Sequence, residues 1–398
     1  MAKYSCFFLL FLLICCAEKP QTDSDMIVFK QDQIETIDKI PFDADEFIDS
    51  CIFVKLETTD ISLIGDITQL ATFEGDFYIY DQKTKKIKVF DQAGKFLRDI
   101  GKLGQGPQEY LSISAFVINP KDRKIAIFDP AKKNVLEYSL DGSYLRSVSL
   151  PDQECAFFKK TVYAGDYIYC YMTINYVYNN AYVVLSSEDY AVKDRFYSYL
   201  IHPDDYMAFN WATHPFIFFD EKLHYASLFS DTIFAYENGT KRPYLFVETG
   251  KPNIPLSYLK NRKLENDPSK AFREVFLDKS YSSGFTELGE TNHFILVTHK
   301  LGEAVDDRGV VKSSYYLLNK KSKTGYYVES GFIPDFGKPD LVDGNKFIRI
   351  WDQTSIEAYQ NQIKAKRIEC PEAINSLLKG YDPFDDNPIL AVYYMKEK

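Results

Sequence analysis

Hydrophobic and polar positions recur along this chain at an interval of 48 residues, since positions 77–98 (FYIYDQKTKKIKVFDQAGKFLR) align without a gap on positions 125–146 (IAIFDPAKKNVLEYSLDGSYLR). In both copies a short apolar run ends at an aspartate. A second run alternates between hydrophobic and polar residues, and a third run follows a glycine turn. Alternation with a period of two residues indicates β-strands. Another apolar run precedes each copy, at 67–73 and 114–119. The repeating unit is therefore predicted to contain four strands.

Four strands in roughly 40–50 residues is the period of a β-propeller blade. Weaker versions of the unit follow at 166–196, 223–247, 293–328 and 346–352. The last of them is incomplete and needs strands from elsewhere in the chain. We predict an all-β, six-bladed β-propeller with four-stranded blades, although the chain is long enough for seven. Short helical insertions are expected at 256–277 and at 353–378, the second with a start signal at Pro371.

Two residue types recur at the turns of the repeat. Asp81 and Asp129 end equivalent strands, where an aspartate can accept backbone N–H groups of the following turn. Gly94 and Gly142 lie in equivalent tight turns, which favour glycine because the backbone there needs a positive φ. Recurrence in successive blades favours a structural role for these four residues over a catalytic one.

The first residues have the pattern of an export signal. Lys3 is followed by an unbroken apolar run at 6–14, which is too short for a membrane-spanning helix but suits a secretory signal. The sequence LICC, which ends at Cys16, resembles the lipobox of bacterial lipoproteins, in which the cysteine after the cleavage site carries acyl chains. We therefore predict lipidation of Cys16. The alternative is an ordinary secretory signal whose cysteines are incidental.

This interpretation divides the chain into a signal peptide at 1–15, a lipid-anchored tether at 16–45 and a single propeller domain at 46–398. In bacterial lipoproteins, a residue such as Ala17 in place of aspartate after the lipidated cysteine favours transfer to the outer membrane. The predicted location is therefore the cell envelope, and the membrane is a predicted partner through the anchor.

The composition indicates a β-rich, acidic protein. Its 30 tyrosines and 31 phenylalanines are residues that suit strands. Loss of the signal would remove only the charge of Lys3, which changes the net charge from −10 to about −11. Nucleic acid is not expected as a partner, because phosphate binding requires a basic surface.

Four cysteines lie outside the predicted signal and anchor: Cys51, Cys155, Cys170 and Cys370. None of them forms the CxxC pair of a metal knuckle or a redox site. Cys155 and Cys170 could form a disulfide in an oxidising envelope, although buried thiols are the favoured interpretation.

The stretches 90–96 (FDQAGKF) and 101–110 (GKLGQGPQEY) resemble the signature of six-bladed β-propeller lipoproteins of Gram-negative gut-type bacteria, which are distant relatives of the NHL-repeat propellers. Positions 54–59 (VKLETT) and 386–390 (DNPIL) also resemble the two ends of that family. The resemblance implies the fold and an envelope location and indicates no particular activity.

The motifs of known catalytic and cofactor sites do not fit this sequence. The glycine-rich stretch 101–110 lacks the Lys-Ser or Lys-Thr of a phosphate-binding loop, so we interpret its glycines as a sharp turn between blades. The five histidines form no HExxH or similar ligand spacing, and no Gly-x-Ser-x-Gly motif occurs. We therefore predict no catalytic residue, no metal site and no cofactor.

Two groups of residues are candidates for ligand binding. Gln105 and Glu109 belong to the glycine-rich stretch 101–110 and are expected on the same face as the lysines of the strand turns. Tyr206, Trp211 and His214 lie in an aromatic segment outside the repeat, where exposed rings can hold a ligand. The function predicted is a binding or scaffold module for a protein, peptide or glycan. The alternative is a glycan lyase or hydrolase with its active site at the mouth of the propeller axis.

Overall fold

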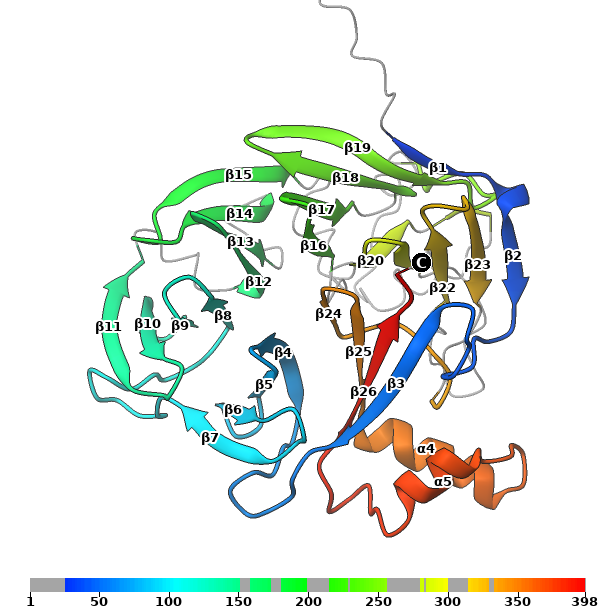
Figure 1. Cartoon of the computed structure of the whole chain (residues 1–398). Coiled ribbons are helices and arrows are strands. Elements are labelled where there is room, and N and C mark those ends of the chain that lie inside the picture. The colour runs from blue at the N-terminus through cyan, green and yellow to red at the C-terminus, as the bar shows by residue number, and fades with distance from the viewer. Residues whose placement is uncertain are drawn as a thin grey trace, which may run out of the picture.

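A computed structural model describes residues 26–150, 158–172, 180–198, 215–227, 230–255, 280–282, 284–299, 314–328 and 333–397. Six sheets of mainly antiparallel strands stand in a ring around a central axis (Figure 1). The prediction of a six-bladed β-propeller is confirmed, and the described residues form no seventh blade.

The first three blades each take four consecutive strands of the chain. From the axis outward the strands are β4 (Ile67–Phe73), β5 (Asp76–Asp81), β6 (Lys86–Phe90) and β7 (Phe96–Ile100) in blade 1; β8 (Ala115–Asn119), β9 (Lys124–Asp129), β10 (Asn134–Ser139) and β11 (Tyr144–Ser149) in blade 2; and β12 (Phe158–Ala164), β13 (Tyr167–Met172), β14 (Asn180–Ser186) and β15 (Val192–Ser198) in blade 3. Hydrogen bonds between neighbouring strands give each blade a simple meander.

The other three blades include strands from the beginning of the chain. From the axis outward they contain β16 (Phe216–Phe219), β17 (Lys222–Ala226), β18 (Thr232–Glu237), β19 (Thr240–Val247) and β1 (Ile27–Phe29) in blade 4; β20 (Phe285–Glu290), β21 (Phe294–His299), β22 (Ser314–Asn319), β23 (Thr324–Val328) and β2 (Ile34–Ile37) in blade 5; and β24 (Leu341–Asp343), β25 (Lys346–Trp351), β26 (Ile389–Met395) and β3 (Ile48–Lys55) in blade 6. The incomplete sixth unit is thus completed by the last strand of the chain and by β3.

Part of the stretch predicted as a tether forms strands. β1 pairs in parallel with β19, and β2 pairs in parallel with β23, so that both run along the outside of the ring (Figure 1). Residues 27–37, predicted to belong to the tether, therefore include two strands of the propeller sheets. The outer edges of β19 and β23 offer backbone N–H and C=O groups, and β1 and β2 form hydrogen bonds with them. Both strands are too short to show a period in the sequence.

Between neighbouring blades lies the hydrophobic core. The described residues form six apolar clusters, and each cluster joins side chains of two adjacent blades. Between blades 1 and 2, for example, Tyr78 and Val89 pack with Phe116 and Ile127. A blade is apolar on both faces and cannot bury them alone, so closing the ring provides each face with a partner.

Two helices interrupt blade 6 between β25 and β26, as predicted for 353–378. They are α4 (Gln353–Lys364) and α5 (Glu372–Leu378). The Asp352 carboxylate accepts the Ser355 N–H at 2.6 Å and caps α4, while Pro371 stands at the start of α5. The other predicted insertion, 256–277, lies outside the described residues.

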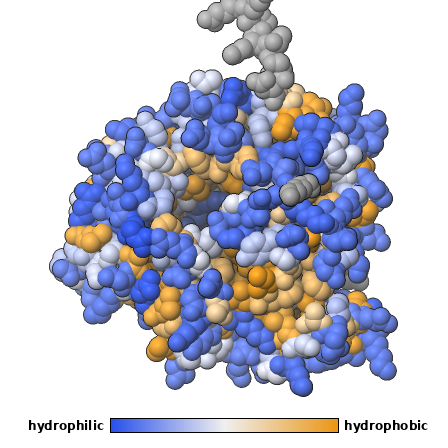
Figure 2. Space-filling view, viewed as in Figure 1, coloured by the Kyte–Doolittle hydropathy of each residue, from blue (hydrophilic) through white to orange (hydrophobic). Residues whose placement is uncertain are grey.

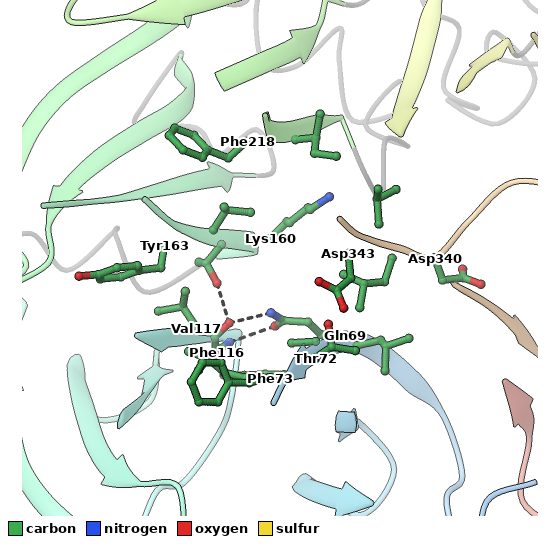
Figure 3. Close-up of a pocket in the computed structure, with 18 of the residues that line it drawn as sticks. Gln69, Thr72, Phe73, Phe116, Val117, Lys160, Tyr163, Phe218, Asp340 and Asp343 are labelled. Atoms are coloured by element: carbon green, nitrogen blue, oxygen red, sulfur yellow. Dashed lines mark hydrogen bonds between the residues drawn. The ribbon is translucent and has the colours of Figure 1, made fainter. Parts of the chain in front are cut away.

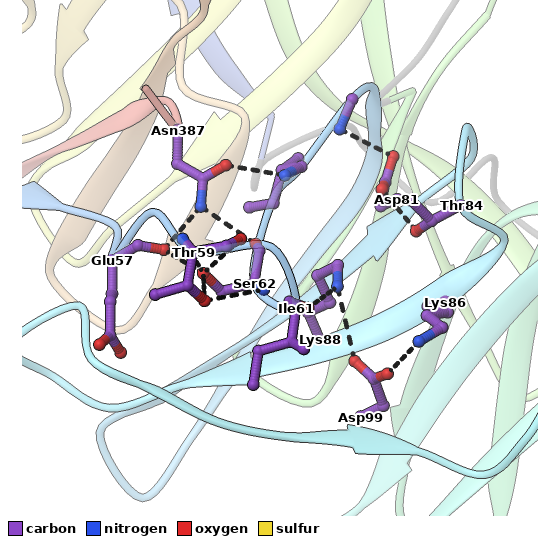
Figure 4. A network of polar contacts seen from close by, with 12 residues as sticks. Glu57, Thr59, Ile61, Ser62, Asp81, Thr84, Lys86, Lys88, Asp99 and Asn387 are labelled. Carbon is purple, nitrogen blue, oxygen red and sulfur yellow. Dashed lines mark hydrogen bonds and ion pairs between the residues drawn. The ribbon is translucent and has the colours of Figure 1, made fainter. Parts of the chain in front are cut away.

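A buried asparagine joins the two ends of the ring at blade 6. The Asn387 Nδ2 donates to Glu57 O at 2.7 Å and to Ser62 O at 3.0 Å, and its Oδ1 accepts the Ile64 N–H at 2.7 Å (Figure 4). The Asn387 N–H also donates to the Thr58 hydroxyl at 2.9 Å. The two stretches that resemble the ends of a known family therefore meet here, where the chain passes from blade 6 into blade 1.

The recurring aspartates connect parts of the same blade. Asp81 accepts the N–H of Asp66 at 2.9 Å and that of Lys83 at 3.1 Å, so it holds both the segment that enters blade 1 and the turn after β5. In blade 2, Asp129 accepts the N–H of Leu111 at 2.7 Å and that of Ala131 at 3.0 Å. Both carboxylates are fully buried.

Candidate functional site

The inner strands of all six blades surround a cavity of about 360 Å³ on the propeller axis. Figure 2 shows the opening as a hollow within the ring. Ligand sites in proteins commonly have volumes of about 300–1,000 Å³ and combine apolar walls with a few polar groups. The axial cavity is therefore the candidate functional site.

Most of the cavity wall is apolar. Its apolar residues come from every blade or from the segments that enter the blades: Leu70, Ala71, Phe73, Phe116, Val117, Ile118, Pro120, Val162, Ile217, Phe218, Leu288, Pro339, Leu341 and Val342. The Tyr163 ring and the side chains of Thr68, Thr72 and Thr161 add polar atoms. A wall of this kind favours ligands that bring apolar groups into the cavity.

Side chains, rather than strand pairing, connect the inner strands of blades 1, 2 and 3. The Gln69 amide donates to Phe116 O at 2.6 Å and accepts the Phe116 N–H at 3.0 Å, and the Thr161 hydroxyl donates to the same carbonyl at 2.7 Å (Figure 3). Three blades are thereby fixed to one another at the cavity wall. This arrangement gives the site a rigid frame before any ligand binds.

A bulge orients one lysine on the inner strand of blade 3. The pairing of β12 with β13 passes from Phe158 directly to Lys160, so that Lys159 is the extra residue. Bulges of this kind bend a strand and redirect its side chains. Figure 3 shows the Lys160 side chain extending into the space between the blades.

The Lys160 amine lies in surroundings with little water. Its Nζ donates to Phe216 O at 2.9 Å and lies 5.1 Å from the centre of the Phe216 ring. Burial lowers the pKa of Lys160 to about 7, while the Glu287 carboxylate opposes the change and the Lys338 ammonium adds to it. Near neutral pH this amine is therefore poised between its charged and neutral forms.

Two aspartates face the cavity from blade 6. Asp340 accepts the Ile350 N–H at 2.7 Å, and Asp343 forms an ion pair of 3.2 Å with Lys346. Burial raises the pKa of Asp340, chiefly against the attraction of the Lys338 ammonium. In a ring of six blades, blade 6 stands opposite blade 3, so the aspartates and the lysines occupy opposite walls (Figure 3).

Of the predicted binding residues, Gln105 and Glu109 lie in the segment between blades 1 and 2 and do not line the axial cavity. Glu109 forms an ion pair of 2.9 Å with Lys102 and accepts the Gly106 N–H at 2.9 Å, and both contacts lower the pKa of its carboxyl. Lys132 donates to Gly106 O at 2.6 Å, so this lysine lies beside the loop as expected.

That loop borders a separate cavity of about 520 Å³ near the outside of blades 1 and 2, lined in part by Glu109 and Tyr144.

The other predicted binding residues, Tyr206, Trp211 and His214, lie outside the described residues. The sequence did not point to Lys160, Asp340 or Asp343. Each of them lies in an inner strand or next to one. The residues that face it across the cavity are far away in the sequence, so the local pattern does not reveal the site.

One histidine belongs to a buried polar group between blades 4 and 5. The His224 Nδ1 lies 2.7 Å from the Glu290 carboxylate, which also pairs with Lys320 at 2.9 Å. His224 and Lys320 both lower the pKa of Glu290, although burial opposes them. Within the described residues, no three or more His, Cys, Asp or Glu side chains come together so as to hold a metal ion.

Comparison with known proteins assigns the chain to a family. Residues 28–394 match the model of a family described as a domain of unknown function, DUF4934. The chain belongs to this family. The matched range extends from β1 to β26, so the DUF4934 domain includes the strand that borders blade 4 as well as the six blades. A search of curated proteins finds no match.

Two solved structures share the fold of this DUF4934 chain. A Bacteroides fragilis protein described as exported is similar at a TM-score of 0.69 with 18% identity, over 94% of this chain and 100% of that one. A member of the DUF4221 family from Bacteroides vulgatus has a TM-score of 0.50 and 10% identity, over 88% of this chain and 97% of its own. At such identities the likeness shows the fold alone. In the part of the chain that the structure describes, no helix has the length and apolar character needed to cross a membrane.

Proposed function

We propose that this protein is an exported, lipid-anchored module of the cell envelope that binds a protein, peptide or glycan ligand at the propeller axis. The observation that carries the proposal is the axial cavity, with its apolar walls and its few charged groups. The export signal, the lipobox-like Cys16 and the fold shared with an exported Bacteroides protein support the location.

The cavity has the features expected of a binding site for part of a larger molecule. Its volume of about 360 Å³ suits a few residues or one sugar, and its rim is formed by segments from different blades. The Gln69 and Thr161 hydrogen bonds fix the wall in advance, which reduces the entropy lost when a ligand binds. A scaffold role is compatible with the same face, because a partner protein can insert a single loop.

The alternative is an enzyme that acts on a glycan as a lyase or hydrolase. Lys160 favours this candidate, because an amine with a pKa of about 7 can accept a proton near neutral pH. The charged groups lie on opposite walls of a mostly apolar cavity, and this arrangement suits binding better than proton transfer at one reacting bond.

The test is a cavity-blocking variant. Thr72→Trp places a large ring on the cavity wall, while Thr240→Trp places the same ring at an exposed position on β19 and serves as the control. Ligands identified on peptide and glycan arrays are titrated against both variants by calorimetry. We expect Thr72→Trp to weaken binding at least tenfold and Thr240→Trp to leave it unchanged.

Equal binding by both variants would contradict a ligand site at the axis. Turnover of an oligosaccharide by the pure protein, lost in Thr72→Trp and Lys160→Met, would support the enzyme in place of the binding module.

A further inference from the structure

We propose that the axial cavity selects a zwitterionic ligand, namely a short peptide with a free carboxylate and a free amino group. This inference rests on the function proposed above and specifies its ligand class. In the proposed complex the carboxylate lies toward Lys160 and Lys159 on blade 3, and the ammonium lies toward Asp340 and Asp343 on blade 6.

The charges of the cavity are separated by sign. Both lysines that line it come from β12, and both aspartates come from β24 or the residue before it. The inner strands follow one another around the axis in sequence order, so three blade positions separate the two pairs. A ligand with one charge is attracted to one wall only, whereas a ligand with opposite charges at its two ends can satisfy both walls.

The lining between the two charged walls combines apolar and polar residues. Blades 2 and 4 contribute the half-buried Ile118 and Phe218, and blade 1 contributes Thr72 (Figure 3 shows Phe218 and Thr72). An apolar side chain between the two ends of a peptide would be buried against Ile118 and Phe218, at about 25 cal/mol per Å².

Two ion pairs lie beside the cavity and reduce the charge of its walls. Lys338 and Glu287 lie 2.8 Å apart, with Glu287 acting on Lys160 and Lys338 acting on Asp340. Lys346 lies 3.2 Å from Asp343, so Asp340 provides most of the negative charge of the blade 6 wall. The aspartate wall also continues outward. Asp340 borders a second cavity of about 250 Å³ between blades 6 and 1, which Asp66 and Asp352 line as well. The amino end of the peptide therefore has both negative charge and room beyond Asp340.

The experiment uses four equimolar libraries of random tripeptides, with both ends free, the amino end acetylated, the carboxyl end amidated, or both ends blocked. Each library is incubated with the exported protein, and the retained peptides are quantified by mass spectrometry. We expect free peptides to be retained at least tenfold more than singly blocked peptides, and doubly blocked peptides to be retained least.

Charge-specific variants assign each end of the peptide to a wall. Lys160→Met should remove the preference for a free carboxylate and keep the preference for a free amine. Asp340→Asn can still accept the Ile350 N–H, and it should remove the preference for the free amine only. Lys193→Met and Asp189→Asn, both at exposed positions of blade 3, are the controls and should change neither preference.

Blocked peptides retained as strongly as free ones would overturn the inference, and so would no retention of any free peptide. The proposed function has its own readout in the same assay. Glycan or blocked-peptide binding that is lost in Thr72→Trp would leave the binding module in place without a zwitterionic ligand. Binding that no cavity variant alters would overturn both.

Discussion

Single residues determine how this ring is closed. Asn387 is 1% exposed, and its side chain satisfies two backbone carbonyls and one backbone N–H of the segment that leads into blade 1. From blade 1, the buried Lys88 amine donates to Ile61 O at 2.6 Å in the same segment (Figure 4). Four backbone polar groups of this connection therefore have side-chain partners although it belongs to no sheet.

Asn387→Ala should destabilise the protein by about 3 kcal/mol, since three side-chain hydrogen bonds are lost and buried backbone groups are left without partners. The free energy of unfolding in urea is the measurement. Ser376→Ala, at an exposed position of α5, is the control and should change stability by less than about 0.5 kcal/mol. Similar free energies of unfolding for the two variants would mean that the Asn387 side chain does not stabilise the junction between blades 6 and 1.

Gly94 and Gly239 separate two effects of a glycine substitution. Both have positive φ, +84° and +81°, so alanine is strained at either position. At Gly94 a Cβ would also overlap Lys55 O of β3, whereas at Gly239 no atom lies within 4 Å. We expect Gly239→Ala to cost about 1 kcal/mol and Gly94→Ala about 2 kcal/mol more, measured by thermal unfolding. Equal losses would show that β3 moves away freely.

Lys160 should make stability depend on pH. Its pKa falls from 10.5 to about 7 on folding, so between these values the unfolded chain binds more protons than the folded one. The stability due to this group therefore rises with pH across that window, and its cost is complete below pH 7. Urea unfolding should show Lys160→Met more stable than the parent by about 2 kcal/mol at pH 6, with a smaller difference at pH 9. A difference that stays constant with pH would contradict the lowered pKa.

At the scale of elements, the first three strands lie at the outer edges of three blades. β1 and β2 extend blades 4 and 5, and β3 completes blade 6. Phe29 of β1 is fully buried in the cluster between blades 4 and 5. These strands therefore add core contacts as well as backbone hydrogen bonds.

Removal of residues 1–38 should lower the melting temperature clearly relative to removal of residues 1–25. The longer deletion takes away β1, β2 and the buried Phe29 ring, whose loss alone is worth about 3 kcal/mol. Calorimetric melting of the two truncated proteins is the measurement, and the shorter deletion is the control. Identical melting temperatures would mean that β1 and β2 contribute nothing to stability.

At the scale of the whole molecule, the axial cavity is formed jointly by all six blades. No single blade encloses the axial cavity, and its opposite charges come from strands on opposite sides of the ring. In the proposed function, the lipid anchor at Cys16 holds this site at a membrane of the cell envelope.

Cys16→Ser should release the protein from membranes, because acyl chains attach through the thiol of this residue. Cell fractionation is the measurement, and Cys370→Ser, which keeps Cys16, is the control. Retention of Cys16→Ser in the membrane fraction would refute lipidation.

The sequence by itself determined the repeating unit and the helices near Pro371, and it favoured six blades while leaving seven open. These features depend on local alternation and on turn residues such as Gly94, and neighbouring residues are enough to reveal them. The pairing of β1 and β2 was decided only by the tertiary structure, because a strand of three or four residues has no readable period and is held by edges formed far along the chain. The same holds for the axial cavity. Lys160 and Asp340 are ordinary charged residues in sequence, and they become opposite walls of one site only when the ring closes.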